Sequence, residues 1–309
     1  MSALTPAMIL RLLLSAALLT SAHAADPVPA VPAAALPLTL KDGDTVVLLG
    51  DTFFERDYHY GHIETMLTSA AGKAVRFRNL GWSGDTPRGE SRSYFGPPQE
   101  GLDRLQKQLA EIKPAVIIAC YGAVDAFKGE AGSKDFIGSY GRLIDLVQKT
   151  TGAAVVLMSP PAVSADTKRW PSLEGHAAKQ AQCREAIRDL AKSRGLAFAD
   201  LFEAMTNLKL ATVNGVTLTE TDYRAAAPAV AKSLGFSLDA AAVSAAQSNA
   251  ALTKMVLEKN RLFFHRWRPQ NEIYLFGSRK HEQGNNGVEI PQFDPLIAEK
   301  EKQIAALRK

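Results

Sequence analysis

Four short polar motifs contain most of the residues of this sequence that could do chemistry. In chain order they are Gly50-Asp51-Thr52, Asn79 to Thr86, Tyr121 to Asp125, and Asn214 to Thr219. A hydroxyl such as that of Thr52 can attack a carbonyl carbon when a base takes its proton and nearby donors stabilise the oxyanion. We therefore expect the motifs to form one cleft, with Thr52 as its candidate nucleophile.

Each motif lies where a predicted strand ends or a predicted helix begins. Apolar runs too short for helices occupy 45–49, 75–80, 115–120, 154–158 and 196–199. Segments with helical spacing occupy 63–71, 101–112, 136–149 and 173–193. Such alternation predicts an α/β fold, a three-layer α/β/α sandwich around a parallel sheet of five strands. Ligands bind at the carboxyl edge of sheets of this kind.

The last third of the chain has a different composition. Residues 222–260 are alanine-rich and helix-prone, and Pro228 is expected to break the helix there. Residues 261–292 concentrate aromatic and charged side chains in a segment that we interpret as irregular. Residues 295–309 predict a short charged helix with Pro295 in its first turn.

The first residues have the pattern of a cleaved secretory signal. Arg11 precedes an apolar stretch over 12–19, and Ala22-His23-Ala24 has the form of a signal-peptidase site. A membrane anchor would need about 20 apolar residues in a row, and polar residues interrupt this stretch too early. We therefore expect residues 1–24 to be removed, the protein to be secreted or periplasmic, and the mature chain to have no membrane span. Residues 25–40 form a Pro/Ala-rich lead-in.

Composition argues against several classes of partner. The formal net charge is only +4 and is spread along the chain, so nucleic acid is not an expected partner.

Cys120 and Cys183 are interpreted as two buried free thiols in preference to a disulfide. His59 and His62 are interpreted as the exposed start of a helix because no third metal ligand is visible. We expect neither a metal nor a cofactor.

The ordered motifs resemble those of the SGNH (GDSL) hydrolases, which are esterases and lipases with a flavodoxin-like three-layer sandwich. The resemblance runs from about Thr45 to Leu234 and is strongest over 83–86, 101–105 and the strand that ends at Tyr121-Gly122. It implies a hydrolase-like domain over 41–236 and a C-terminal extension over 237–309. In this family a block I Ser is the nucleophile. A block II Gly amide and a block III Asn complete the oxyanion hole, and the His of a D-x-x-H motif is the base.

The resemblance assigns Thr52, Gly84, Asn214 and Thr217 to the family's catalytic positions. Thr52 stands in for Ser, Gly84 is retained, Val124 replaces the Asn, Asn214 replaces the Asp and Thr217 replaces the His. Val124 offers no hydrogen-bond donor, and the loss of one oxyanion donor typically lowers the rate by about 10²–10³. Position 217 lacks an imidazole that could accept a proton near neutral pH.

The resemblance thus implies a carbohydrate- or acyl-ester hydrolase lineage with weak or atypical activity. The alternative is a catalytically inactive protein that binds a glycan or acyl ligand in the same cleft. A small-molecule or carbohydrate ester is the expected ligand in both cases.

Several further residues are candidates for contact with that ligand. Asp51 and Asp85 could line the cleft or shape its loops through backbone amides, and Asp125 could line the cleft or cap a helix. Arg88 could face a ligand or solvent. His265 and Arg266 belong to the aromatic and cationic cluster 263–268, where His265 is either a substitute base or a packed structural side chain. The segment 261–292 suits a lid, a carbohydrate-facing wall or a strap across the domain.

Overall fold

The computed structural model describes residues 34–94, 96–127, 129–162, 175–214 and 216–308. Within them, a five-stranded sheet has the order β2-β1-β3-β4-β5, and all neighbouring strands are parallel. The strands are β1 (Thr45–Gly50), β2 (Arg76–Gly81), β3 (Val116–Cys120), β4 (Ala154–Met158) and β5 (Ala197–Ala199). All five predicted strands are confirmed. The expected signal peptide lies outside the described residues.

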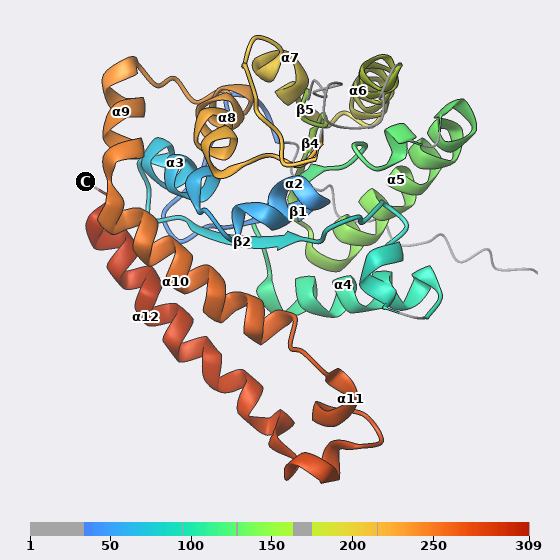
Figure 1. Cartoon of the computed structure of the whole chain (residues 1–309), viewed down its shortest axis with the longest axis vertical. Coiled ribbons are helices and arrows are strands. Elements are labelled where there is room, and N and C mark those ends of the chain that lie inside the picture. Colours follow the sequence, from blue (N-terminus) through green and yellow to red (C-terminus); the bar gives the residue numbers. More distant parts are fainter. Residues whose placement is uncertain (1–33, 95, 128, 163–174, 215, 309) are drawn as a thin grey trace, which may run out of the picture. The chain divides into compact units, whose positions relative to one another are not determined.

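Two layers of helices cover the two faces of the sheet (Figure 1). Side chains alternate along β1, so Val46 and Leu48 pack into one core while Val47 and Leu49 pack into another. The first core includes α2 (Thr52–Asp57), α3 (His62–Ala71), α7 (Leu201–Met205) and α8 (Glu220–Ser233). The second includes α4 (Pro98–Ile112), α5 (Gly129–Thr151) and α6 (His176–Ser193). The predicted α/β/α sandwich is therefore confirmed.

The C-terminal extension is a helical hairpin beside the edge strand β2 (Figure 1). It contains α9 (Ala240–Ser248), α10 (Ala250–Trp267), α11 (Glu272–Leu275) and α12 (Phe293–Leu307), with short 3-10 turns between α11 and α12. Leu252 and Val256 of α10 pack against Ile304 of α12. Lys259 donates to the Phe77 carbonyl oxygen of β2 at 2.9 Å, so α10 covers an edge that would otherwise be open to pairing.

The structure corrects two expectations for this region. Residues 261–267 are not irregular but continue α10, because Phe263 is buried in the core and extends the apolar face of that helix. Pro228 lies inside α8 without ending it. A proline lacks the amide that would bond to the carbonyl four residues earlier, and Gln247 Nε2 instead donates to that Arg224 carbonyl oxygen at 2.8 Å. The predicted helix with Pro295 in its first turn is present as α12.

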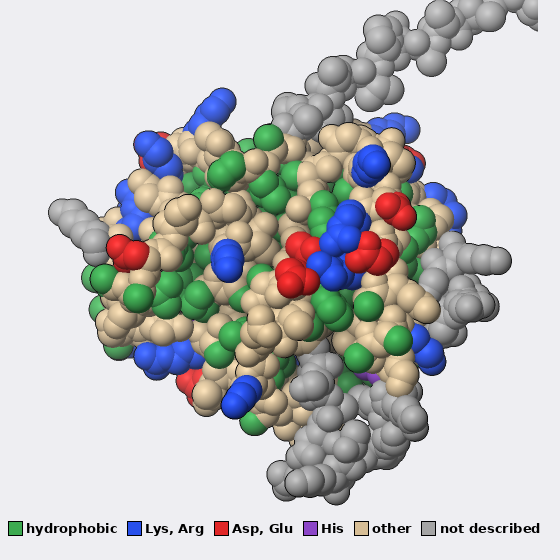
Figure 2. All heavy atoms as spheres, turned by 90° about the horizontal axis from the view of Figure 1, so that it is seen from above, with side chains coloured by type: hydrophobic (Ala, Val, Ile, Leu, Met, Phe, Trp, Pro, Cys, Tyr) green, Lys and Arg blue, Asp and Glu red, His purple; other side chains and the backbone are tan. Residues whose placement is uncertain are grey.

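Charged side chains of both signs are interspersed over the surface. Figure 2 shows a central group of basic side chains flanked by acidic ones on the face that it presents. Ion pairs of this kind include Arg184 of α6, whose Nη2 is 2.7 Å from Asp200 Oδ2 and 3.0 Å from Glu203 Oε2. The charge of Arg184 is thus offset by neighbouring carboxylates.

Both cysteines are buried and neither forms a disulfide, as expected from the sequence. Cys120 ends β3, and Cys183 lies on the buried face of α6. Within the described ranges, no helix has both the length and the apolar character needed to cross a bilayer.

Candidate functional site

The carboxyl end of β1 sets the position of Thr52. A Cβ atom at Gly50 would lie 2.3 Å from the Cys120 carbonyl oxygen, so only glycine fits where β1 passes β3. Asp51 then caps α2 by accepting a hydrogen bond from the Phe53 amide at 3.1 Å. Thr52 is the first residue of α2 and stands at the sheet edge where the sequence predicts a cleft.

The loop after β2 brings Gly84 to Thr52. The Gly84 amide donates a hydrogen bond to Thr52 Oγ1 at 3.0 Å. Gly84 has a φ of 73°, a backbone conformation that favours glycine. The Trp82 amide fixes the start of the loop by donating to the Gly50 carbonyl oxygen at 3.0 Å. The structure thus brings together Thr52 and Gly84, which the sequence analysis predicts to be the nucleophile and block II residues.

Asp85 holds this loop in place from beneath. Its side chain is buried and accepts hydrogen bonds from Arg92 Nε at 2.6 Å, Tyr121 Oη at 3.2 Å and the Ser91 amide at 3.3 Å. Arg92 is itself only 1% exposed. Because these partners occupy the carboxylate, Asp85 shapes the loop. It does not line the cavity that lies beside Thr52.

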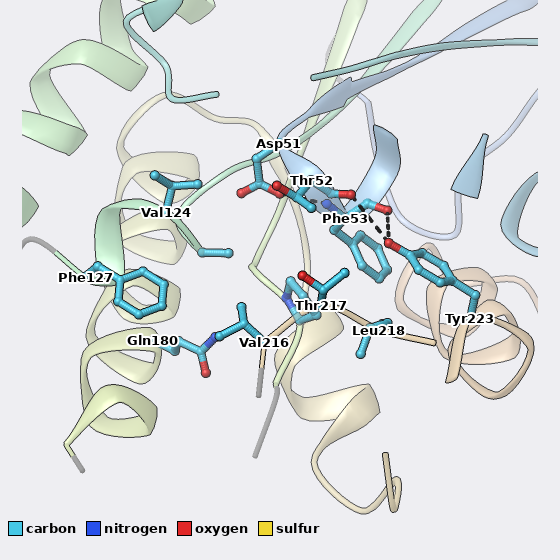
Figure 3. A pocket seen from close by; sticks show the side chains of 12 residues that line it. Asp51, Thr52, Phe53, Val124, Phe127, Gln180, Val216, Thr217, Leu218 and Tyr223 are labelled. Atoms are coloured by element: carbon cyan, nitrogen blue, oxygen red, sulfur yellow. Dashed lines mark hydrogen bonds between the residues drawn. The ribbon is translucent and has the colours of Figure 1, made fainter. Parts of the chain in front are cut away.

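A cavity of about 210 Å³ lies beside Thr52 (Figure 3). Its wall is mostly apolar, with a few polar groups that could orient a ligand. The lining residues are Asp51, Thr52, Phe53, Ala123, Val124, Phe127, Pro161, Gln180, Val216, Thr217, Leu218 and Tyr223.

Two residues that the sequence analysis predicts to replace family catalytic residues lie in this wall. Val124 presents methyl groups to the cavity, and Thr217 presents a side chain without a basic nitrogen (Figure 3). Asn214 does not line the cavity. It is exposed, and its Oδ1 accepts hydrogen bonds from the Thr217 amide at 2.7 Å and the Val216 amide at 3.2 Å, which closes the turn that carries both residues.

Asp51 is the acidic group of the cavity wall. It is 1% exposed, and its Oδ2 has no hydrogen-bond partner among the described residues. Burial, together with the nearby carboxylates of Asp85 and Asp125, raises the pKa of Asp51 from its ordinary value of 3.8 to about 7. The hydrogen bond from the Phe53 amide acts in the opposite direction. Asp51 can therefore exchange a proton near neutral pH.

Arg88 and Asp125 form an ion-pair network beside the cavity and do not line it. Arg88 Nη2 is 3.2 Å from Asp125 Oδ1, Arg88 Nε is 3.1 Å from Glu90 Oε1, and Arg88 Nη1 is 2.9 Å from Asp135 Oδ2. Asp125 is fully buried. The network ties the loop after β2 to the turn after β3.

His265 and Arg266 lie on α10, away from the cavity wall. The His265 ring packs against Phe264 and Phe293, with ring centroids 5.9 and 6.1 Å apart. Arg266 is paired with Asp294 and Glu111 at 3.0 and 3.2 Å. Neither side chain contacts Thr52, so His265 does not supply a base to it in this structure.

Arg268, at the end of α10, contacts the loop that carries Gly84. Its guanidinium carbon is 3.7 Å from the ring centroid of Trp82, and its Nη1 is 3.2 Å from Glu55 Oε1. Glu55 Oε2 accepts a hydrogen bond from Ser83 Oγ at 2.6 Å. The C-terminal extension therefore braces the residue that precedes Gly84, a role that the sequence analysis did not assign to Arg268.

Gln180 and Phe127 also line the cavity without having been singled out from the sequence. Gln180 shares one buried face of α6 with Cys183 and Ile187. A glutamine within an apolar helical stripe is a detectable signal, because a buried amide needs partners.

The described residues contain no group of three or more His, Cys, Asp or Glu side chains that could hold a metal ion. His62 is 3.7 Å from Glu220, and the His59 ring packs against Tyr58 with centroids 4.9 Å apart.

Comparison with known proteins gives a family match over the same region. The profile of the GDSL-like lipase/acylhydrolase family matches residues 48–218. No curated protein sequence matches the chain significantly.

Several solved structures are similar over the sandwich. A lipase/acylhydrolase from Enterococcus faecalis is 20% identical, with 62% of this chain and 95% of that one covered and a TM-score of 0.45. A catalytic mutant of the acetylxylan esterase Axe2 from Geobacillus stearothermophilus is 14% identical, with 65% and 98% covered and a TM-score of 0.49. The M. smegmatis aryl esterase is 17% identical, with 61% and 97% covered and a TM-score of 0.48.

Proposed function

Because the chain belongs to the GDSL-like lipase/acylhydrolase family, we propose that its cleft binds acyl or carbohydrate esters and hydrolyses them slowly, with Thr52 as nucleophile. The observation that carries this proposal is the hydrogen bond from the Gly84 amide to Thr52 Oγ1 at 3.0 Å, beside an apolar cavity. An ester carbonyl oxygen placed near Thr52 could accept the same amide hydrogen as negative charge develops on it.

The cavity suits the acyl part of such an ester. Its apolar walls come from Phe53, Phe127, Val216 and Leu218, and no Arg or Lys is among the described residues that line it. Burial of an uncharged hydrocarbon group there is favourable, at about 25 cal/mol per Å² of apolar surface removed from water. A carbohydrate ester would place its acyl group in the cavity and its sugar outside.

Two features support slow turnover. Val124 supplies no second oxyanion donor, which alone accounts for a rate loss of about 10²–10³. The Thr52 hydroxyl has no hydrogen-bond acceptor among the described residues, so its proton must reach water or a substrate atom instead of a preorganised base.

Hydrolysis of an aryl butyrate and an acetylated polysaccharide tests the proposal. The chain is compared with its Thr52→Ala and Thr52→Ser variants, because removal of the methyl group should ease attack while removal of the hydroxyl should abolish it. We expect Thr52→Ser to be faster than the natural chain and Thr52→Ala to fall to the uncatalysed rate. Equal rates for all three proteins would refute the role of Thr52.

Ligand binding without turnover is the second candidate function. It is favoured by the missing acceptor for the Thr52 hydroxyl and by Val124 at the family's Asn position. Saturable binding of the ester, together with hydrolysis that does not differ between the natural chain and Thr52→Ala, would establish it.

We further propose export through residues 1–24, on the strength of the sequence pattern alone. N-terminal sequencing of protein recovered from the extracytoplasmic fraction should find Ala25 as the first residue. An intact Met1 on that protein would contradict the proposal.

A further inference from the structure

The cavity beside Thr52 has an amide in its wall that the proposed hydrolysis does not use. Gln180 is 1% exposed, and both its Oε1 and its Nε2 lack hydrogen-bond partners among the described residues. Figure 3 shows Gln180 near Val216 and Phe127, well separated from Asp51 and Thr52. The reactive hydroxyl and the unpaired amide thus occupy different parts of one cavity.

A buried amide without partners is unusual in a folded protein. It presents two N–H donors and a carbonyl acceptor, and removing all of them from water without compensation is unfavourable. Almost all such groups are paired with protein, water or ligand. Gln180 therefore has hydrogen-bonding capacity left over for a molecule in the cavity.

The surroundings of Gln180 hold this wall in place. His176, one turn earlier on α6, stacks on Phe127 with ring centroids 4.1 Å apart and an angle of 24° between the rings. Phe127 in turn lines the cavity. The stack fixes the aromatic wall next to the amide. The amide itself is held by α6, because Gln180 lies within that helix.

The charge of the lining indicates the kind of group that Gln180 would bind. The described residues that line the cavity include no Arg or Lys, so they offer no counter-ion to a carboxylate or phosphate buried there. The amide both donates and accepts, which matches a group that also does both. A hydroxyl on an otherwise apolar ligand meets these requirements.

We propose that Gln180 recognises a hydroxyl group carried on the acyl chain of the ligand, so that the cavity selects hydroxyacyl esters over unsubstituted ones. The inference rests on the proposed function only in taking the cavity as the acyl site. It does not require that Thr52 turn the ester over.

Equilibrium binding tests the inference separately from catalysis. Thr52→Ala, which removes the proposed nucleophile, is titrated by calorimetry with the ethyl esters of butanoic, pentanoic and hexanoic acids and with their terminally hydroxylated counterparts. For at least one chain length we expect the hydroxylated ester to bind about tenfold or more tightly than its parent, because a site built around a hydrogen bond rejects ligands that lack it. Failure of every hydroxylated ester to bind, or equal binding within each pair, would overturn the inference.

Gln180→Leu in the same background removes the amide and keeps an apolar side chain in the wall. It should abolish the preference for the hydroxylated ester, whereas Gln182→Leu, an exposed glutamine on the same helix, should keep it. A preference that survives Gln180→Leu would overturn the inference even if the natural chain discriminates. If Gln180→Leu does not fold, Gln180→Met provides the same comparison.

The proposed hydrolysis is judged by its own assay. Discrimination in Thr52→Ala together with no Thr52-dependent turnover would leave the Gln180 inference intact and refute only the proposed chemistry. Thr52-dependent turnover without discrimination would do the reverse.

Discussion

The substitution Asp51→Asn should change how the stability of the protein depends on pH. Asp51 is buried, and its folded-state pKa of about 7 lies well above the ordinary value of 3.8. An Asn side chain cannot ionise, but its carbonyl oxygen can still accept the hydrogen bond from the Phe53 amide. The variant therefore removes the titration while leaving the cap of α2 in place.

The sign follows from the direction of the pKa shift. Because the pKa is raised on folding, the folded chain holds a proton that the unfolded chain has released between about pH 4 and about pH 7. The natural chain therefore loses stability as pH rises through this window and loses little more above it. One pKa unit corresponds to about 1.4 kcal/mol, so the full effect is about 4 kcal/mol, of which roughly 3 kcal/mol falls between pH 5 and pH 8.

Urea denaturation at about pH 5 and about pH 8 measures this effect. The unfolding free energy of Asp51→Asn minus that of the natural chain should increase by roughly 3 kcal/mol from the lower to the higher pH. Asp57, whose pKa burial also raises to about 7, is present in both proteins and cancels in the difference. Asp239→Asn, at the exposed N-cap of α9, controls for the exchange of an acidic cap. A difference for Asp51→Asn that does not change with pH would refute the reasoning.

Three further predictions concern other parts of the molecule. Arg268→Ala, which removes the brace on the loop that carries Gly84, should lower any Thr52-dependent esterase rate by about tenfold while the unfolding midpoint changes little; an unchanged rate would contradict it. Lys259 forms a buried ion pair with Glu64 at 2.7 Å. Lys259→Ala leaves the Glu64 carboxylate without its cation, so urea denaturation should show a loss of about 3–5 kcal/mol in the free energy of unfolding. A loss below about 1 kcal/mol would contradict this prediction. Gln247→Leu should lower the free energy of unfolding by about 1 kcal/mol, because the Arg224 carbonyl oxygen loses its hydrogen bond. An unchanged free energy of unfolding would contradict this prediction.

Most of the fold followed from the sequence because the central strands β1, β3 and β4 have a strong local signal. Runs such as 116–120 and 154–158 are buried on both faces, so every residue is apolar and the pattern is unambiguous. Pro228 gave a false break, because its effect is offset by Gln247 on another helix. A contact between residues this far apart leaves no local trace in the sequence.

The site was predictable only in part. Thr52, Gly84, Val124 and Thr217 could be placed at one sheet edge because each follows a strand or precedes a helix. The inward position of Gln180 depends on how α6 packs against neighbouring elements, and the contact of Arg268 depends on the path of the C-terminal hairpin. Both are set by tertiary packing: helical spacing can place Gln180 on the buried stripe of α6, but it does not show which cavity that stripe faces.

The most direct test of the account is a covalent trap of the proposed nucleophile. An aryl phosphonate is incubated with the natural chain and with Thr52→Ala, and the intact proteins and their peptides are examined by mass spectrometry. If Thr52 attacks the phosphorus and the aryloxide leaves, the natural chain should gain one phosphonyl group on the peptide that contains Thr52, and the variant should gain none. An unmodified natural chain, or a label that persists in Thr52→Ala, would contradict the account.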